Sequence, residues 1–145
     1  MEELKVRAKN LGEWVEGYFC VYRGIPQILV DESSWEPIDD IKTVGRYTGL
    51  CDKNGNKIFE GDIVKTQPFY DRPYSNKRKS KQFIGIVKYK TRIFNGNDYH
   101  SKQCYHGEWG LEFNEDFGEY NYYDWGELWD CEVIGNEWDN PELLK

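Results

Sequence analysis

The chain has 145 residues, of which 26 are acidic and 19 basic, so its formal net charge is −7 and its pI is near 4.9. A chain of this length can bury a core of its own, and one domain over residues 1–145 is therefore expected. Aromatic residues make up 17% of the chain, and rings favour strands, which argues against a fold of long helices. No run of about 18 apolar residues is present for a membrane span, and the charged N-terminus lacks the apolar segment of a signal peptide, so a cytoplasmic protein is predicted.

The first third of the chain has the pattern of short strands separated by turns. Apolar and charged residues alternate between Leu4 and Lys9, which indicates a strand with one solvated face. Further along, Gly24-Ile25-Pro26 turns the chain into a strand that returns against the one before it. The predicted strands cover residues 4–9, 13–22, 27–30 and 43–47, and residues 31–40, which contain Pro37, are expected to form a loop.

Residues 47–64 carry the most specific local signals. Asn54-Gly55 predicts a tight hairpin, because a type I′ turn needs positive φ at both central positions. Gly61 permits a turn or a bulge, and the carboxylate of Asp62 is expected to accept hydrogen bonds from backbone N–H groups there. We therefore interpret these four residues as structural turn residues.

The second half of the chain contains longer polar segments between its predicted strands. Residues 66–82 have two prolines, a basic cluster and no periodicity, which predicts a long loop. Residues 95–107 are polar and rich in Gly, which predicts another loop. Residues 140–144 contain a proline near their start and predict a short closing helical turn. The predicted strands of this half cover residues 83–90, 109–113 and 132–136.

Charge is divided unevenly along the chain. Residues 65–92 hold nine Lys or Arg and a single acid, whereas residues 108–145 hold twelve acids and a single Lys. This division suits self-association, an intramolecular pairing or plain solubility. The basic segment also combines phosphate-neutralising cations with rings that can stack on bases, although the acidic pI argues against a dedicated nucleic-acid binder. The candidate nucleic-acid-binding residues are Tyr70, Tyr74, Lys77, Arg78, Lys79 and Lys81.

Residues 119–129 are aromatic and acidic together. Tyr and Trp anchor protein interfaces more often than other residues do, so this run predicts a surface for a protein partner. The candidate partner-binding residues are Tyr120, Tyr122, Tyr123, Trp125 and Trp129. The alternative is that part of these rings belongs to the core of the fold.

The sequence offers no firm catalytic or metal site. Its four cysteines form no CxxC pair, so they are expected to be reduced thiols rather than zinc ligands. Two weaker arrangements stay open: His100 with Cys104 and His106, and Glu60 with Asp62 on one face of a strand. The serines lie in no triad or nucleophile-elbow context. We therefore expect no enzymatic activity, no metal and no cofactor.

Three segments of the chain resemble the YopX family of small proteins encoded by phages and prophages. The central segment, residues 44–64, reads VGRYTGLCDKNGNKIFEGDIV and carries the most specific part of the resemblance. Residues 4–8 and residues 132–144 resemble the opening and closing segments of the family, in the expected order. Lys9 and the basic loop at 66–82, which resembles an insertion, depart from the family pattern.

The resemblance implies an all-β, YopX-like barrel or sandwich with long loops and at most short helical turns. It supplies no established activity. We therefore predict a non-enzymatic accessory protein of a phage or prophage, in the cytoplasm of the bacterial host, that binds a host or phage protein or further copies of itself, with no membrane partner. Nucleic-acid binding through residues 65–92 is the alternative function.

Overall fold

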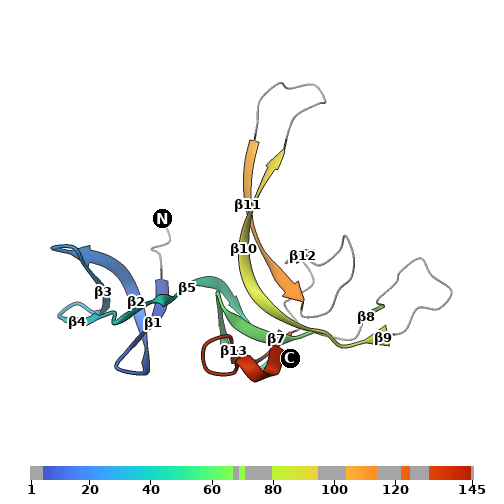
Figure 1. Ribbon diagram of the computed structural model, residues 1–145, viewed down its shortest axis with the longest axis horizontal. Coiled ribbons are helices and arrows are strands. Elements are labelled where there is room, and N and C mark those ends of the chain that lie inside the picture. The colour runs from blue at the N-terminus through green and yellow to red at the C-terminus, as the bar shows by residue number, and fades with distance from the viewer. Residues whose placement is uncertain are drawn as a thin grey trace. The chain divides into compact units, whose positions relative to one another are not determined.

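The computed structural model describes the chain in segments (Figure 1). The described residues are 5–66, 69–70, 80–94, 104–113, 122–124 and 131–144, with side chains described over 5–66, 82–89, 109–113 and 131–144. The chain divides into two compact units, Met1–Leu50 with Lys57–Glu60 and Cys51–Asn56 with Gly61–Lys145. Each unit is described by itself, and a single domain over residues 1–145 stays a prediction.

A six-stranded sheet makes up the first unit, in the order β4-β3-β2-β1-β5-β6. Its strands are β1 (Lys5–Asn10), β2 (Glu13–Tyr22), β3 (Ile25–Asp31), β4 (Ser34–Pro37), β5 (Asp40–Cys51) and β6 (Lys57–Phe59). The chain folds through β1 to β4 as successive antiparallel hairpins and then returns to the free side of β1 as β5. The all-β fold class predicted from the sequence is confirmed.

Period-two alternation in β1 produces the core of this unit. Val6 and Ala8 point to one face and are 1% exposed. The apolar cluster on that face consists of Val6, Ala8, Ile28 and Ile38, with Val15 and Val44 packed against it. Gly17 lies opposite Val6, and a Cβ at Gly17 would stand 2.6 Å from Cγ2 of Ile28. Glycine is therefore required at this position of β2, because atoms of the neighbouring strand β3 occupy the space of a side chain.

Part of the predicted loop over residues 31–40 is wrong, because Ser34–Pro37 forms the strand β4. β4 pairs with β3 and places Trp35 opposite Leu29. Pro37 is compatible with a strand here because β4 is the edge of the sheet and Pro37 is its last residue, where a missing N–H disrupts no inner ladder.

Most of the described part of the second unit is a sheet in the order β12-β11-β10-β7-β13. Its strands are β7 (Asp62–Lys65), β10 (Ile84–Phe94), β11 (Cys104–Phe113), β12 (Tyr122–Asp124) and β13 (Glu132–Asn136), and a separate ladder joins β8 (Phe69–Tyr70) to β9 (Ser80–Lys81). The predicted strand over residues 132–136 is confirmed. The predicted loops over 66–82 and 95–107 are wrong at β8, at β9 and at the first residues of β11, because cross-strand pairing continues into these polar segments.

The chain closes with the 3-10 helix η3 (Pro141–Leu144), as its proline predicts. None of the described residues forms a helix long and apolar enough to cross a membrane.

Strand β7 lies between β10 and β13, and its burial forms the core of the second unit. Ile63 and Val64 are completely buried, and the rings of Phe83 and Phe113 pack with their centroids 5.7 Å apart. Gly61 leads into β7 with φ +90°, and its N–H donates to the carbonyl of Val87. The predicted turn at Gly61 is therefore present, and it fixes the entry of β7 into the sheet.

The turn of the hairpin that joins β5 to β6 differs from the predicted type I′. Gly55 has φ +83°, but Asn54 is not among the described residues with positive φ. The N–H of Gly55 donates to the carbonyl of Asp52, and the N–H of Asp52 donates to the carbonyl of Asn56. These bonds describe a three-residue loop, in which a tight turn is followed by a glycine in the left-handed region.

Two-residue turns with positive φ at both positions occur elsewhere in the sheet. Leu11 and Gly12 have φ of 53° and 80° between β1 and β2, and Arg23 and Gly24 have φ of 51° and 77° between β2 and β3. In both turns, the twist of the flanking strands imposes a left-handed backbone on a residue that the sequence rules do not favour there. The sequence signal for a turn with two positive φ values therefore lies at Asn54-Gly55, whereas the structure has such turns at Leu11-Gly12 and Arg23-Gly24.

Candidate protein-binding surface

The site residues predicted from the sequence lie outside the side chains that the structure describes. Tyr70, Lys81, Tyr122 and Tyr123 lie on the short strands β8, β9 and β12, of which the backbone alone is described. The others lie outside the described residues; they are Tyr74, Lys77, Arg78, Lys79, Tyr120, Trp125 and Trp129. Their roles stay predictions, and the surface below is built from other residues.

The β2–β3 hairpin has an apolar sequence on both sides of its turn. Residues 18–22 read YFCVY and residues 25–30 read IPQILV, with Gln27 as their one polar side chain. A strand with one solvated face alternates apolar and polar residues, whereas a continuous apolar run is typical of a strand that is covered on both faces. By this rule, the sequence predicts that the side chains on both faces of the hairpin are buried.

Exposed apolar side chains nevertheless lie on both faces of the hairpin, although Ile28 is buried in the core of the unit. The register pairs Phe19 with Ile28 on one face and Tyr18 with Leu29 on the other. The exposed side chains, which we call the hairpin patch, are Tyr18 (42% exposed), Phe19 (36%), Val21 (59%), Tyr22 (58%), Ile25 (51%) and Val30 (45%). Several exposed apolar side chains gathered on one hairpin are typical of an interaction surface.

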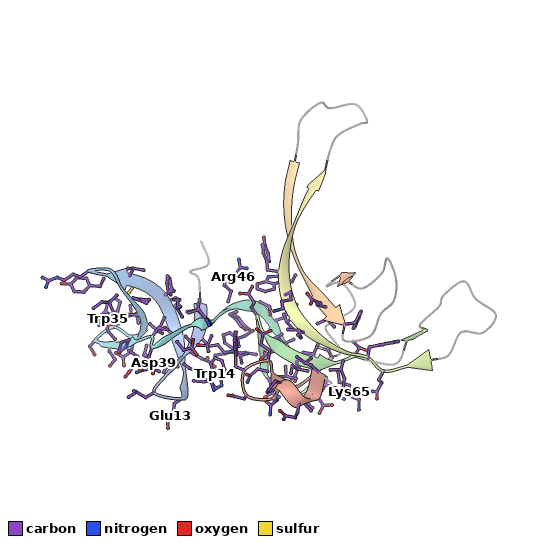
Figure 2. All side chains as sticks on the ribbon, viewed as in Figure 1. Glu13, Trp14, Trp35, Asp39, Arg46 and Lys65 are labelled. Carbon is purple, nitrogen blue, oxygen red and sulfur yellow. The ribbon has the colours of Figure 1, made fainter. Side chains whose placement is uncertain are left out.

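One face of the hairpin patch continues across the sheet onto β4. Trp35 lies opposite Leu29, which in turn lies opposite Tyr18, so the three side chains form one row across β2, β3 and β4. Trp35 is 49% exposed. Its side chain is labelled in Figure 2. Rings that are held on paired strands and left open to solvent are the kind of side chain that anchors protein interfaces.

The turn at the tip of the hairpin is compact. Arg23 and Gly24 close it in two residues, and the guanidinium carbon of Arg23 stands 5.3 Å from the centroid of the Tyr22 ring. This cation–ring contact leaves Tyr22 at the tip, 58% exposed. The two strands that carry the hairpin patch are thus joined by a short turn.

Among the described residues of the second unit, Asp52 accepts several hydrogen bonds through its carboxylate. The Asp52 carboxylate accepts hydrogen bonds from the N–H groups of Asn54 (2.9 Å), Asn56 (2.8 Å) and Val133 (2.9 Å), and from the side-chain amide of Asn56 (3.3 Å). Burial raises the pKa of Asp52, but the hydrogen bonds from Val133, Asn56 and Asn54 outweigh it, so the pKa is lowered overall. Asp52 fixes the 51–56 turn to β13, which is a structural role.

The paired carboxylates considered as a metal site are held in other ways. The Glu60 carboxylate accepts hydrogen bonds from the Arg46 guanidinium at 3.1 Å and 3.4 Å, and Asp62 is 1% exposed opposite Asn136. Over the part of the chain that the structure describes, no three His, Cys, Asp or Glu side chains gather as a metal site would require. The cluster of His100, Cys104 and His106 lies outside the described side chains.

Two features of the structure, one at the candidate surface and one with a structural role, are missed by the sequence rules. The sequence correctly predicts two antiparallel strands in the hairpin. The signal for its surface is the lack of apolar–polar alternation in residues 18–30, which puts apolar side chains on both faces. Asp52 lies in a segment dominated by the Asn54-Gly55 signal, and its long-range partner Val133 cannot be found from local sequence.

Comparison with known proteins bears on the family. No curated protein matches the chain by sequence. The sequence pattern of the family described as YopX protein matches residues 21–145, which include the hairpin from Val21 onward and the whole described part of the second unit. The chain belongs to the YopX family.

Proposed function

We propose that the protein is a non-enzymatic accessory protein of a phage or prophage that binds another protein, or further copies of itself, through the hairpin patch. Its place of action in this proposal is the cytoplasm of the bacterial host. The observation that carries the proposal is the exposure of apolar side chains on both faces of the β2–β3 hairpin.

The physical reason is the hydrophobic effect. Complete burial of a large apolar side chain contributes roughly 1.5–3 kcal/mol, and the hairpin patch holds several such side chains side by side. A partner that covers the patch removes this surface from water without any rearrangement of the sheet. Tyr18, Tyr22 and Trp35 add rings, which are enriched among the residues that dominate binding energy.

A matched pair of variants tests this proposal. Val21→Lys places a charge in the hairpin patch, and Ile41→Lys places one at a similarly exposed apolar position of the same unit outside the hairpin (59% and 56% exposed). Sedimentation velocity over a range of concentrations detects self-association, and affinity capture from lysogenic cells followed by mass spectrometry detects other partners. We expect Val21→Lys to abolish the association and Ile41→Lys to preserve it. Equal behaviour of the two variants and the original chain contradicts the proposal.

Nucleic-acid binding through residues 65–92 is the alternative function. Its support is the composition of that segment, with nine cations and one acid. The combined substitution of Lys77, Arg78 and Lys79 by Gln is expected to weaken a salt-dependent shift of labelled DNA. A shift that this change leaves intact contradicts the alternative.

A further inference from the structure

The face of β1 that points away from the core carries three cations. Lys5, Arg7 and Lys9 alternate with the buried Val6 and Ala8, so the three share one face of the sheet. This arrangement repeats a cation at every second residue along the strand. The spacing of such a row is about 7 Å, close to the separation of neighbouring phosphates in an extended single strand.

A fourth cation, Lys57 of β6, reaches the same face. Its Nζ stands 3.2 Å from Oε2 of Glu16, and Glu16 lies opposite Arg7 on β2. Among the described residues in register with this row, Glu16 and Asp40 are the carboxylates, and the Asp40 carboxylate accepts a hydrogen bond from the N–H of Lys42. We call Lys5, Arg7, Lys9 and Lys57 the cationic row; its charge is opposite to the net −7 of the chain.

The cations of the row are crowded. The pKa of Lys5 is lowered, first by its contact with Lys57, and the pKa of Lys57 is raised by its contacts with Lys5 and Glu16. The ammonium groups of Lys5 and Lys57 therefore lie beside each other, and the Glu16 carboxylate pairs with Lys57. An additional anion placed beside them relieves the repulsion between like charges.

Aromatic rings lie beside the cationic row on the same face. Tyr18 is directly opposite Lys5, and Trp14 is directly opposite Lys9. The guanidinium carbon of Arg7 lies between two rings, 4.6 Å from the centroid of Trp14 and 4.8 Å from that of Phe59. Nζ of Lys9 stands 5.3 Å from the centroid of the Trp14 ring. These contacts interleave positive charge with ring faces.

The row of Tyr18, Leu29 and Trp35 extends this face away from β1. Because neighbouring strands are about 5 Å apart, Tyr18 and Trp35 stand about 10 Å from each other. Tyr18 is 42% and Trp35 49% exposed, so both rings are open to a ligand. Lys5 opposite Tyr18 joins the charged part of the face to the aromatic part.

We propose that this face binds single-stranded nucleic acid, with the cationic row on the phosphates and Tyr18 and Trp35 stacked on bases. Charge complementarity identifies the ligand as an anion, and exposed rings beside the charges favour one that also offers flat faces. Sheet surfaces that combine a positive track with exposed rings bind single strands in this way. The site includes none of residues 65–92. It shares Tyr18 with the hairpin patch, but not Phe19 or Val21, which lie on the opposite face of β2.

Fluorescence anisotropy of the full chain with a labelled oligothymidine of about 16 nucleotides tests the proposal. Each phosphate neutralised on a single strand contributes about 0.7 to the slope of log affinity against log salt, so three to four contacts predict a roughly 20- to 50-fold loss of affinity between about 50 and 200 mM salt. An absence of binding at the lower salt concentration overturns the proposal.

Two matched pairs of variants assign the binding to this face. Lys57 and Lys53 are both exposed lysines paired with a glutamate (42% and 40% exposed side chains), so Lys57→Gln is expected to lower the salt slope by about 0.7 while Lys53→Gln leaves it unchanged. Trp35→Ala is expected to weaken binding about 5- to 150-fold at fixed salt, while Trp138→Ala in the second unit has no effect.

The outcomes of these experiments distinguish binding of nucleic acid from binding of an acidic protein. Binding that none of these substitutions changes overturns the proposal, since another part of the chain is then responsible. Polyglutamate serves as an anionic competitor without bases. If it binds with the same sensitivity to Lys57→Gln and the oligonucleotide does not bind, the face recognises acidic protein and the proposal is wrong.

Discussion

Replacement of Asp52 by Asn is predicted to destabilise the second unit, because the 51–56 turn is fixed to β13 by one carboxylate. Asp52 is 5% exposed, and each of its two oxygens accepts two hydrogen bonds. Oδ1 receives the N–H groups of Asn54 and Asn56, and Oδ2 receives the N–H of Val133 and the side-chain amide of Asn56. An Asn side chain keeps a single acceptor oxygen, so its NH₂ must face other donors in either orientation.

The magnitude follows from the donors that lose their acceptor. A buried donor left without a partner costs roughly 1–3 kcal/mol, and Val133 is half-buried whereas Asn54 and Asn56 are exposed to water. Asp52→Asn is therefore expected to cost about 2 kcal/mol and Asp52→Ala about 3 kcal/mol. Urea denaturation measures the loss, and hydrogen exchange of the Val133 amide shows whether it arises at this contact. Asp31→Asn, at an exposed turn carboxylate that accepts from the N–H of Ser33, is the control with a smaller expected effect.

The same contact predicts a pH dependence. The pKa of Asp52 is lowered in the folded state, so its contribution to stability is complete above the unfolded value of about 3.9 and is lost as the pH falls through the lower folded value. The difference in unfolding free energy between the original chain and Asp52→Asn should stay constant from neutral pH to about pH 5 and shrink below about pH 4. Two results would refute this reasoning. One is an Asp52→Asn variant as stable as the original chain at neutral pH, and the other is a difference in unfolding free energy between the two proteins that does not change with pH.

Other substitutions test the need for glycine at particular positions and the hydrogen bonds of the turn after β13. Gly61→Ala is expected to cost roughly 1–3 kcal/mol in thermal or urea unfolding, because φ +90° strains any residue with a side chain; a neutral effect would contradict the reading of this turn. Gly17→Ala is expected to cost roughly 1–3 kcal/mol, because its Cβ meets the backbone carbonyl of Leu29 and the side chain of Ile28. Gly12→Ala, at φ +80° with nothing within 4 Å, measures backbone strain without such a collision. Asn136→Ala removes the acceptor of the N–H groups of Trp138 and Asp139 and should cost about 1 kcal/mol, with faster exchange of both amides; unchanged exchange would count against a role of Asn136 in this turn.

The sequence predicts most strands because alternation and turn residues act locally. Residues 13–22 and 132–136 match β2 and β13, and Pro141 marks the start of η3. Strand β4 is missed because Pro37 indicates a loop, and only its pairing with β3 makes it a strand. The turn types depend on the twist of the paired strands, so Arg23 adopts a positive φ that Asn54 does not.

The candidate surface is predicted less well than the fold. The aromatic run over residues 119–129 draws attention by composition, whereas the hairpin patch is spread over two strands with fewer rings. Exposure is a property of the assembled sheet: YFCVY reads as a covered strand, and only the neighbours of β2 decide which side chains stay open. The cationic row likewise needs Lys57 to be brought across the sheet to Glu16.

Site-specific photocrosslinking tests the role of the hairpin most directly. A photoreactive residue is placed at Val21, within the hairpin patch, and separately at Ile41, a similarly exposed position outside it, in cells that produce the protein. The account predicts a discrete crosslinked product from Val21, containing either a second copy of the chain or one other protein, and none from Ile41. The same products from both positions, or none from Val21, would contradict the claim that the hairpin is a protein-binding surface.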